Sequence, residues 1–297
     1  MKGAGSLPMQ SNSKTTMTRI RDLLSRGVEE LQALGTSEAQ ASTESMLQEL
    51  LNLSRSSIYL HSEQPVQDEI TKLFDTQLEQ RKTRIPLAYI LGKTYFWKEC
   101  LAVGPGCLIP RPETEILVEI VTDLFKDPST AFSFLDIGTG SGAITVSLLR
   151  HFVHARATLL DISQKALGYA EANLFRYDLR ERSEMIVSDL FQNVDPAAKW
   201  DLIVSNPPYL SKKDWSQLQP ELHYEPEMAL RGGEDGLDFY RRILKEARRF
   251  LRPKGWLVFE IGIGQEEALQ NLLTQNGFET IQIRKDYSGI ERVIQAR

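Results

Sequence analysis

The segment Asn206-Pro207-Pro208-Tyr209 has the residue types that most clearly indicate chemistry. Its two prolines fix φ and remove two N–H donors, so this turn presents carbonyl acceptors. An NH₂ group held between the Asn206 side-chain oxygen and the Pro207 carbonyl would have both hydrogens engaged, and the Tyr209 ring can lie flat against a planar group. We expect Asn206, Pro207 and Tyr209 to be catalytic and all four residues to bind the substrate. A loop that merely ends a strand with two prolines is the alternative.

A second signal is the run Gly138-Thr139-Gly140-Ser141-Gly142, which follows the apolar segment 132–136 and precedes a helical pattern. A strand, a glycine turn and a helix N-terminus let a ligand approach the backbone closely, which predicts a nucleotide-like ligand. With Ala143 the run also fits the glycine fingerprint of dinucleotide-binding proteins. By itself this match is weak evidence for a dinucleotide over another nucleotide-like ligand. Asp136 favours S-adenosylmethionine, because a carboxylate there would repel a pyrophosphate but attract an amino group and a sulfonium.

Two more acidic residues follow the next two apolar runs. Asp161 is placed to accept hydrogen bonds from ribose hydroxyls, with an N-cap as the alternative role. Asp189 could accept from the adenine amino group, with Leu190 and Phe191 in the apolar wall beside it, although Phe191 alone is more typical of a core residue. The residues that we assign to the cofactor are Asp136, Gly138, Thr139, Gly140, Ser141, Gly142, Asp161, Asp189, Leu190 and Asn206.

Together the two signals predict methyl transfer from S-adenosylmethionine to a planar nitrogen. The lone pair of such a nitrogen is delocalised, so the nitrogen is a poor nucleophile. No general base is needed if the proton leaves after the methyl group arrives. Catalysis then depends on proximity and alignment, with the acceptors of the turn stabilising the positive charge that grows on nitrogen.

The elements that must position these residues follow from the hydrophobic pattern. We expect a flexible tail over residues 1–16, a helical domain over 17–86, a β-hairpin linker over 87–110 and a methyltransferase domain over 111–297. In the last segment, seven short apolar runs alternate with amphipathic helices, and the final two runs form a closing hairpin. This alternation predicts an α/β fold with a doubly wound, mostly parallel, seven-stranded sheet.

Composition excludes several other classes. The formal charge of −5 weighs against a phosphate backbone as the main partner. Two cysteines without neighbouring histidines indicate neither a metal site nor a disulfide framework, and no apolar stretch approaches the ~20 residues that cross a bilayer. We expect a cytoplasmic monomer without metal or membrane attachment. A mitochondrial or plastid location is the alternative, because the stretch up to Arg21 is basic and lacks acids.

Further segments resemble a known family. They are Leu108 to Glu115, Leu230 to Tyr240, and Glu260-Ile261-Gly262 after Lys254-Gly255. Together with the glycine run, the Asn206 to Tyr209 turn and the helical N-terminal part, they make the chain similar to the HemK/PrmC family from about Met17 to Arg297.

The resemblance implies a Rossmann-like class I S-adenosylmethionine-dependent methyltransferase. Such enzymes methylate the glutamine amide (N5) of the Gly-Gly-Gln motif in class I peptide chain release factors and so modulate translation termination. Carried over by position, Gly138 to Gly142 and Asp161 would bind the cofactor, the Asp189-Leu190 turn would line its adenine, and Asn206 to Tyr209 would hold the glutamine. Many bacterial members have Trp where Leu190 stands. The helical domain would help to dock the release factor.

Two rival hypotheses remain open from the sequence. An enzyme that methylates adenine (N6) or guanine (N2) in nucleic acid could use the same tetrapeptide, but it would need a basic or aromatic platform. Only the arginine-rich helix around Arg241-Arg242 and Arg248-Arg249 offers one, and such a face is usually just solvated. A catalytically silent binding module is the rival from another class, and intact Asn206 and Tyr209 argue against it.

Overall fold

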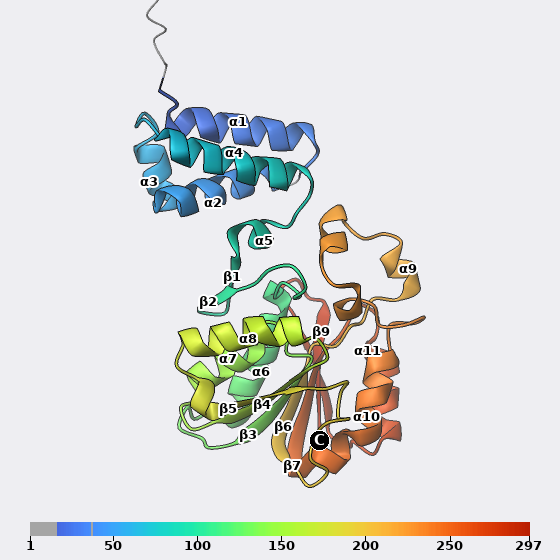
Figure 1. Cartoon of the computed structure of the whole chain (residues 1–297). Helices are drawn as coiled ribbons and strands as arrows, with labels where there is room; N and C mark the ends of the chain where they lie inside the picture. The colour runs from blue at the N-terminus through green and yellow to red at the C-terminus, as the bar shows by residue number, and fades with distance from the viewer. Residues whose placement is uncertain (1–16, 37) are drawn as a thin grey trace, which may run out of the picture. The chain divides into compact units, whose positions relative to one another are not determined.

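The computed structural model describes residues 17–36 and 38–297, in two compact units that divide between Arg84 and Ile85 (Figure 1). The tail expected over residues 1–16 lies outside the described residues. In the part of the chain that the structure describes, no helix combines the length and the apolar character needed to cross a membrane.

The N-terminal unit is helical, as the spacing of its apolar residues predicts. Its helices are α1 (Ile20–Ala33), α2 (Ala39–Leu51), α3 (Arg55–Leu60) and α4 (Asp68–Lys82). Of the apolar side chains with this spacing, Leu23, Met46 and Phe74 are fully buried, whereas Leu34 and Leu73 are about half exposed. Gly27 lets α2 approach α1, because a Cβ there would lie 2.5 Å from Thr43 Cγ2.

The C-terminal unit begins with a short helix and a hairpin. These are α5 (Leu87–Leu91), β1 (Lys93–Phe96) and β2 (Glu99–Ala102). The first residues of the linker expected to be a hairpin over 87–110, Leu87 to Leu91, are therefore helical. Pro86 precedes this helix, and Gly92 ends it in the left-handed conformation with φ of 70°.

The rest of the unit is the predicted doubly wound α/β fold, which is confirmed. Its strands are β3 (Ser133–Ile137), β4 (Arg156–Asp161), β5 (Ser183–Val187), β6 (Trp200–Ser205), β7 (Leu251–Glu260), β8 (Ile281–Lys285) and β9 (Glu291–Ala296). They form one seven-stranded sheet in the order β5-β4-β3-β6-β7-β9-β8. All neighbours are parallel except β9, which runs antiparallel to both β7 and β8.

Helices cover both faces of this sheet (Figure 1). One face packs against α6 (Glu115–Phe125), α7 (Ala143–His151) and α8 (Gln164–Arg176), and the other against α10 (Asp238–Phe250) and α11 (Glu266–Gln275). Successive residues of a strand therefore enter two different hydrophobic cores. In β3, Phe134 joins the first core and Leu135 the second, which explains why this strand is apolar throughout.

The order of strands reverses between β3 and β6. Chain connections lead from β3 outward through β4 to β5, whereas β6 leads outward on the other side to β7. In the parallel pair, Ile137 is opposite Ser205, so the segments that leave these two strands start side by side. Such a switch point creates a crevice at the carboxyl ends of the strands.

Replacing Phe152 by Ala should lower the free energy of unfolding by about 3–5 kcal/mol, because a fully buried ring leaves a cavity. Phe152 packs edge-on against Phe132 at 5.0 Å between ring centres. Urea denaturation checks this, with Phe175→Ala as the matched control, since Phe175 is 72% exposed. Equal losses for both variants would contradict the assignment of the core.

Candidate active site

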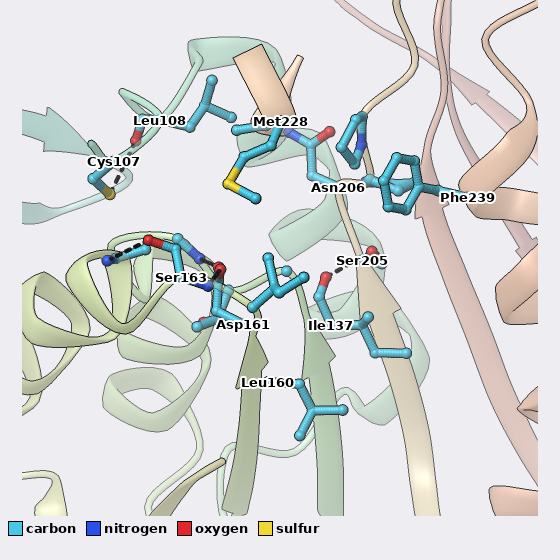
Figure 2. Close-up of a pocket in the computed structure, with 18 of the residues that line it drawn as sticks. Cys107, Leu108, Ile137, Leu160, Asp161, Ser163, Ser205, Asn206, Met228 and Phe239 are labelled. Atoms are coloured by element: carbon cyan, nitrogen blue, oxygen red, sulfur yellow. Dashed lines mark hydrogen bonds between the residues drawn. The ribbon is translucent and has the colours of Figure 1, made fainter. Parts of the chain in front are cut away.

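A cavity of about 220 Å³ lies at the carboxyl ends of β3 to β6 (Figure 2). Asp161, at the end of β4, and Asn206, after β6, both line it. The loops that contribute to its walls include residues 106–110, 137–141, 160–163, 188–190, 205–208 and 226–229. The structure therefore brings the glycine run and the proline turn to one site.

The glycine run forms one wall of this cavity. Gly138 and Gly140 have φ of 71° and 57°, which side chains disfavour, and a Cβ on either would meet no atom within 4 Å. A ligand can therefore approach their backbone closely. Thr139 and Ser141 also line the cavity, whereas Gly142, with φ of 77°, precedes α7 and packs against Ala170.

Asp136 lies behind the glycine run and does not line the cavity. It is fully buried, and its Oδ2 accepts hydrogen bonds of 2.7 Å from the hydroxyls of Thr139 and Thr145. Its Oδ1 has no hydrogen-bond partner. Burial raises the pKa of Asp136 to about 6, although the two threonine hydroxyls lower it. The sequence predicted a cofactor contact for Asp136, but this carboxyl group does not reach the cavity and instead supports the glycine run through Thr139.

Asp161 connects two walls of the cavity. Its Oδ2 accepts a hydrogen bond from the Gly140 N–H and its Oδ1 from the Ser163 N–H, both at 2.9 Å. Each carboxylate oxygen keeps a lone pair for a ligand hydroxyl. Burial raises the pKa of Asp161, whereas these backbone hydrogen bonds lower it. The hydroxyl of Ser163 caps the N-terminus of α8. Asp161 is therefore not the N-cap of this helix, and its carboxylate is left to accept hydrogen bonds from a ligand.

The turn after β5 carries Asp189 and Leu190, which both line the cavity. Leu190 adopts a left-handed conformation with φ of 53°, and both oxygens of Asp189 lie 2.7 Å from the guanidinium of Arg242 on α10. Arg242 also lines the cavity, so it is not merely part of a solvated helix face. Phe191 stacks on Phe250 in the core.

The proline turn supplies the opposite wall. Asn206, Pro207 and Pro208 line the cavity, whereas Tyr209 is packed behind the turn, where burial and then Glu260 raise the pKa of its phenol. The Tyr209 carbonyl accepts a 3.0 Å hydrogen bond from Gln265 Nε2. The Asn206 amide donates from Nδ2 to the Thr114 hydroxyl at 3.1 Å.

Leu108 and Met228 line the cavity but were not predicted as site residues, and Glu225, which lies outside the lining, connects the segments that carry them. Glu225 is buried and accepts hydrogen bonds from the Ile109 N–H at 2.9 Å and from Arg111 at 2.6 Å. This contact joins the 106–111 loop to the segment that carries Met228, and Leu108 and Met228 lie across the cavity from Leu160 (Figure 2). In the sequence, the segment around Leu108 indicates only the family resemblance, and no local pattern points to Glu225.

The residues present fit S-adenosylmethionine. Carboxylate acceptors at Asp161 suit ribose hydroxyls, and the apolar side chains of Leu190, Ile162 and Phe239 suit a purine ring. A pyrophosphate would instead meet the two acidic residues of the lining, Asp161 and Asp189.

Comparison with known proteins gives consistent matches. Residues 22–92 match the PrmC N-terminal domain, and residues 113–234 match the Methyltransferase small domain. A release factor glutamine methyltransferase from Fusobacterium nucleatum is 37% identical over 93% of this chain and 78% of its own length. One from Geobacter sulfurreducens is 38% identical over 89% of this chain and 91% of its own length.

Among solved structures, the hMettl16 catalytic domain in complex with MAT2A 3'UTR hairpin 6 has a TM-score of 0.54. It is 15% identical and covers 77% of this chain and 82% of that chain. At 15% sequence identity, this structural similarity shows a shared fold alone.

The buried carboxyl of Asp136 predicts a pH dependence of stability. Because its pKa is raised to about 6 in the folded state, the stability contributed by its protonated form is lost as the pH rises through that value. Asp136→Asn should therefore gain stability relative to the unchanged protein between pH 5 and pH 8, by on the order of 1 kcal/mol. Urea denaturation of both proteins at the two pH values measures this; a difference that does not change with pH would contradict it.

Proposed function

This chain belongs to the release factor glutamine methyltransferase family, and on that premise we propose that it methylates the side-chain amide nitrogen (N5) of glutamine in the Gly-Gly-Gln motif of class I peptide chain release factors. The observation that carries the proposal is the shared cavity of the glycine run and the Asn206-Pro207-Pro208 turn. S-adenosylmethionine is the proposed methyl donor, and a monomer in the cytoplasm remains part of the proposal.

The proline turn holds the acceptor amide. The glutamine NH₂ donates one hydrogen to Asn206 Oδ1 and the other to the Pro207 carbonyl, which turns one face of its nitrogen toward the glycine run. Because both prolines restrict the backbone, these acceptors are aligned before the substrate arrives. Tyr209 is partly buried against the second hydrophobic core and does not line the cavity, so it supports the position of the turn.

When bound, S-adenosylmethionine supplies an electrophilic methyl group on a sulfonium. The bond from the glutamine nitrogen to this carbon forms as the carbon–sulfur bond breaks, so a neutral thioether leaves. The nitrogen then loses one proton to solvent. As positive charge grows on nitrogen, the Asn206 and Pro207 oxygens stabilise it, so no strong base is required.

The other residues orient the cofactor. Asp161 accepts from the ribose hydroxyls while the Gly140 and Ser163 N–H groups hold its carboxylate in place. Leu190 and Phe239 offer apolar contact to the adenine, and the Arg242 pair holds Asp189 at the cavity edge. The N-terminal helical unit, matched by the PrmC N-terminal domain, is proposed to dock the release factor.

Incubation with methyl-labelled S-adenosylmethionine tests the proposal. A class I release factor should acquire one methyl group on the glutamine of its Gly-Gly-Gln motif, located by tandem mass spectrometry. A release factor with that glutamine changed to Ala is the control and should stay unlabelled. Label on the control protein, or only on DNA or RNA, would replace the proposal with another substrate class.

Asn206→Ala should lower kcat about 10²- to 10³-fold, because an acceptor aligned with the developing charge is lost. Its Kd for S-adenosylmethionine, measured by calorimetry, should change little. Asp161→Asn should show the opposite pattern, with Kd about tenfold weaker, since one ribose acceptor becomes a donor. If both variants failed mainly in cofactor binding, Asn206 would not be the residue that holds the acceptor amide.

A further inference from the structure

A chain of polar side chains lies directly behind Asn206. Asn206 Nδ2 donates to Thr114 Oγ1 at 3.1 Å, and Thr114 Oγ1 donates to Glu260 Oε2 at 2.5 Å. Both Thr114 and Glu260 are almost completely buried, at 4% and 1% exposure. The sequence alone indicated no role for either residue in holding Asn206.

The sheet register explains how these residues meet. Ser205 of β6 is opposite Phe259 of β7, so the residues that follow, Asn206 and Glu260, stand side by side at the carboxyl edge. Thr114 reaches the same place from the short 3-10 helix η1 (Pro112–Thr114) that precedes α6. Glu260 itself does not line the cavity, so it touches the substrate site only through its neighbours.

The direction of hydrogen bonding along this chain is set by Glu260. An ionised carboxylate only accepts, so the single hydroxyl proton of Thr114 must point to Glu260. The Thr114 oxygen then offers only lone pairs to Asn206, and only the NH₂ end of that amide can face it. Asn206 Oδ1 is thereby left for the cavity, where the acceptor of the proposed reaction is needed.

We propose that Glu260 is a positioning residue for methyl transfer, which acts through Thr114 to fix the Asn206 amide with its oxygen toward the glutamine NH₂. This inference rests on the proposed function, since it assigns the orientation of the group that holds the acceptor amide. A reversed Asn206 amide would present hydrogens to the glutamine NH₂ and repel it.

The surroundings of Glu260 make its protonation state sensitive to pH. Burial raises the pKa of Glu260 to about 7, whereas the Thr114 hydroxyl and the positive charge of Arg292 on β9 lower it. Glu113 on η1 raises it, and Tyr209 lowers it by a hydrogen bond. From α10, the Tyr240 hydroxyl donates to the Glu260 backbone carbonyl at 2.8 Å.

Protonation would end the acceptor-only character of this carboxyl group. The Thr114 hydroxyl proton would then be free to point to Asn206, and the Asn206 amide would no longer be held in one orientation. Activity that depends on the ionised form should therefore rise with pH through about 7.

Glu260→Gln is the variant that tests the proposal most sharply, because it keeps the shape but adds a donor. It should lower kcat about tenfold, change KM for the release factor less than about threefold, and abolish the rise of kcat through pH 7. Thr114→Val should lower kcat by a similar factor, whereas Thr114→Ser, which keeps the hydroxyl, should retain activity. Thr114→Val combined with Glu260→Gln should be no less active than Thr114→Val alone, because both substitutions break the same series of hydrogen bonds.

Glu99→Gln is the matched control for removing a buried carboxylate. Glu99 is 3% exposed and pairs with Arg150 away from the cavity. Its loss should change stability but leave the pH profile of kcat unchanged. If Glu99→Gln altered that profile as Glu260→Gln does, or if Glu260→Gln kept the rise through pH 7, the positioning role would be overturned.

A readout without catalysis separates this inference from the proposed function. In protein labelled with ¹⁵N at asparagine, the Asn206 Nδ2 protons, assigned by their loss in Asn206→Ala, should exchange slowly with solvent. Thr114→Val and Glu260→Gln should each make them exchange faster. A protein that methylates no release factor but shows this pattern would refute the proposed function and keep the hydrogen-bond chain. Unchanged exchange in both variants would overturn the chain itself.

Discussion

The reversal of strand order between β3 and β6 is the constraint on which the site depends. Parallel strands end at the same edge, and at this point the chain leaves in opposite directions, which opens a crevice between the two departing segments. The glycine run follows β3 and the proline turn follows β6. A residue pair separated by almost seventy positions, Gly138 and Asn206, is thereby brought to one cavity.

Carboxylates at the strand ends give this edge its chemical character, and each is stabilised differently. Asp136 keeps one oxygen without a partner, Asp161 is held by two backbone N–H groups, and Glu260 accepts from Thr114. Buried charges are costly unless they are paired or hydrogen-bonded. Of the three, only Asp161 lines the cavity, whereas Asp136 and Glu260 act through the hydroxyls of Thr139 and Thr114, which do line it.

Local patterns predicted the parts of the site that are encoded within a few residues. A tight turn between a strand and a helix requires glycines that can adopt positive φ, and two consecutive prolines restrict the backbone of a turn. Both features can therefore be recognised from the sequence. The seven apolar runs likewise predicted the sheet. The pairs Thr114 with Glu260 and Arg111 with Glu225 join positions more than a hundred residues apart. Only the folded topology brings them together, so no local pattern could reveal them.

The central claim concerns the contact between the proline turn and an amide nitrogen. The most direct measurement is a crystal structure with S-adenosylhomocysteine and a release-factor peptide that contains the Gly-Gly-Gln motif. We expect the glutamine Nε2 within hydrogen-bond distance of Asn206 Oδ1 and the Pro207 carbonyl oxygen, facing the sulfur atom. A glutamine bound elsewhere, or an Asn206 amide whose NH₂ faces the cavity, would contradict the account.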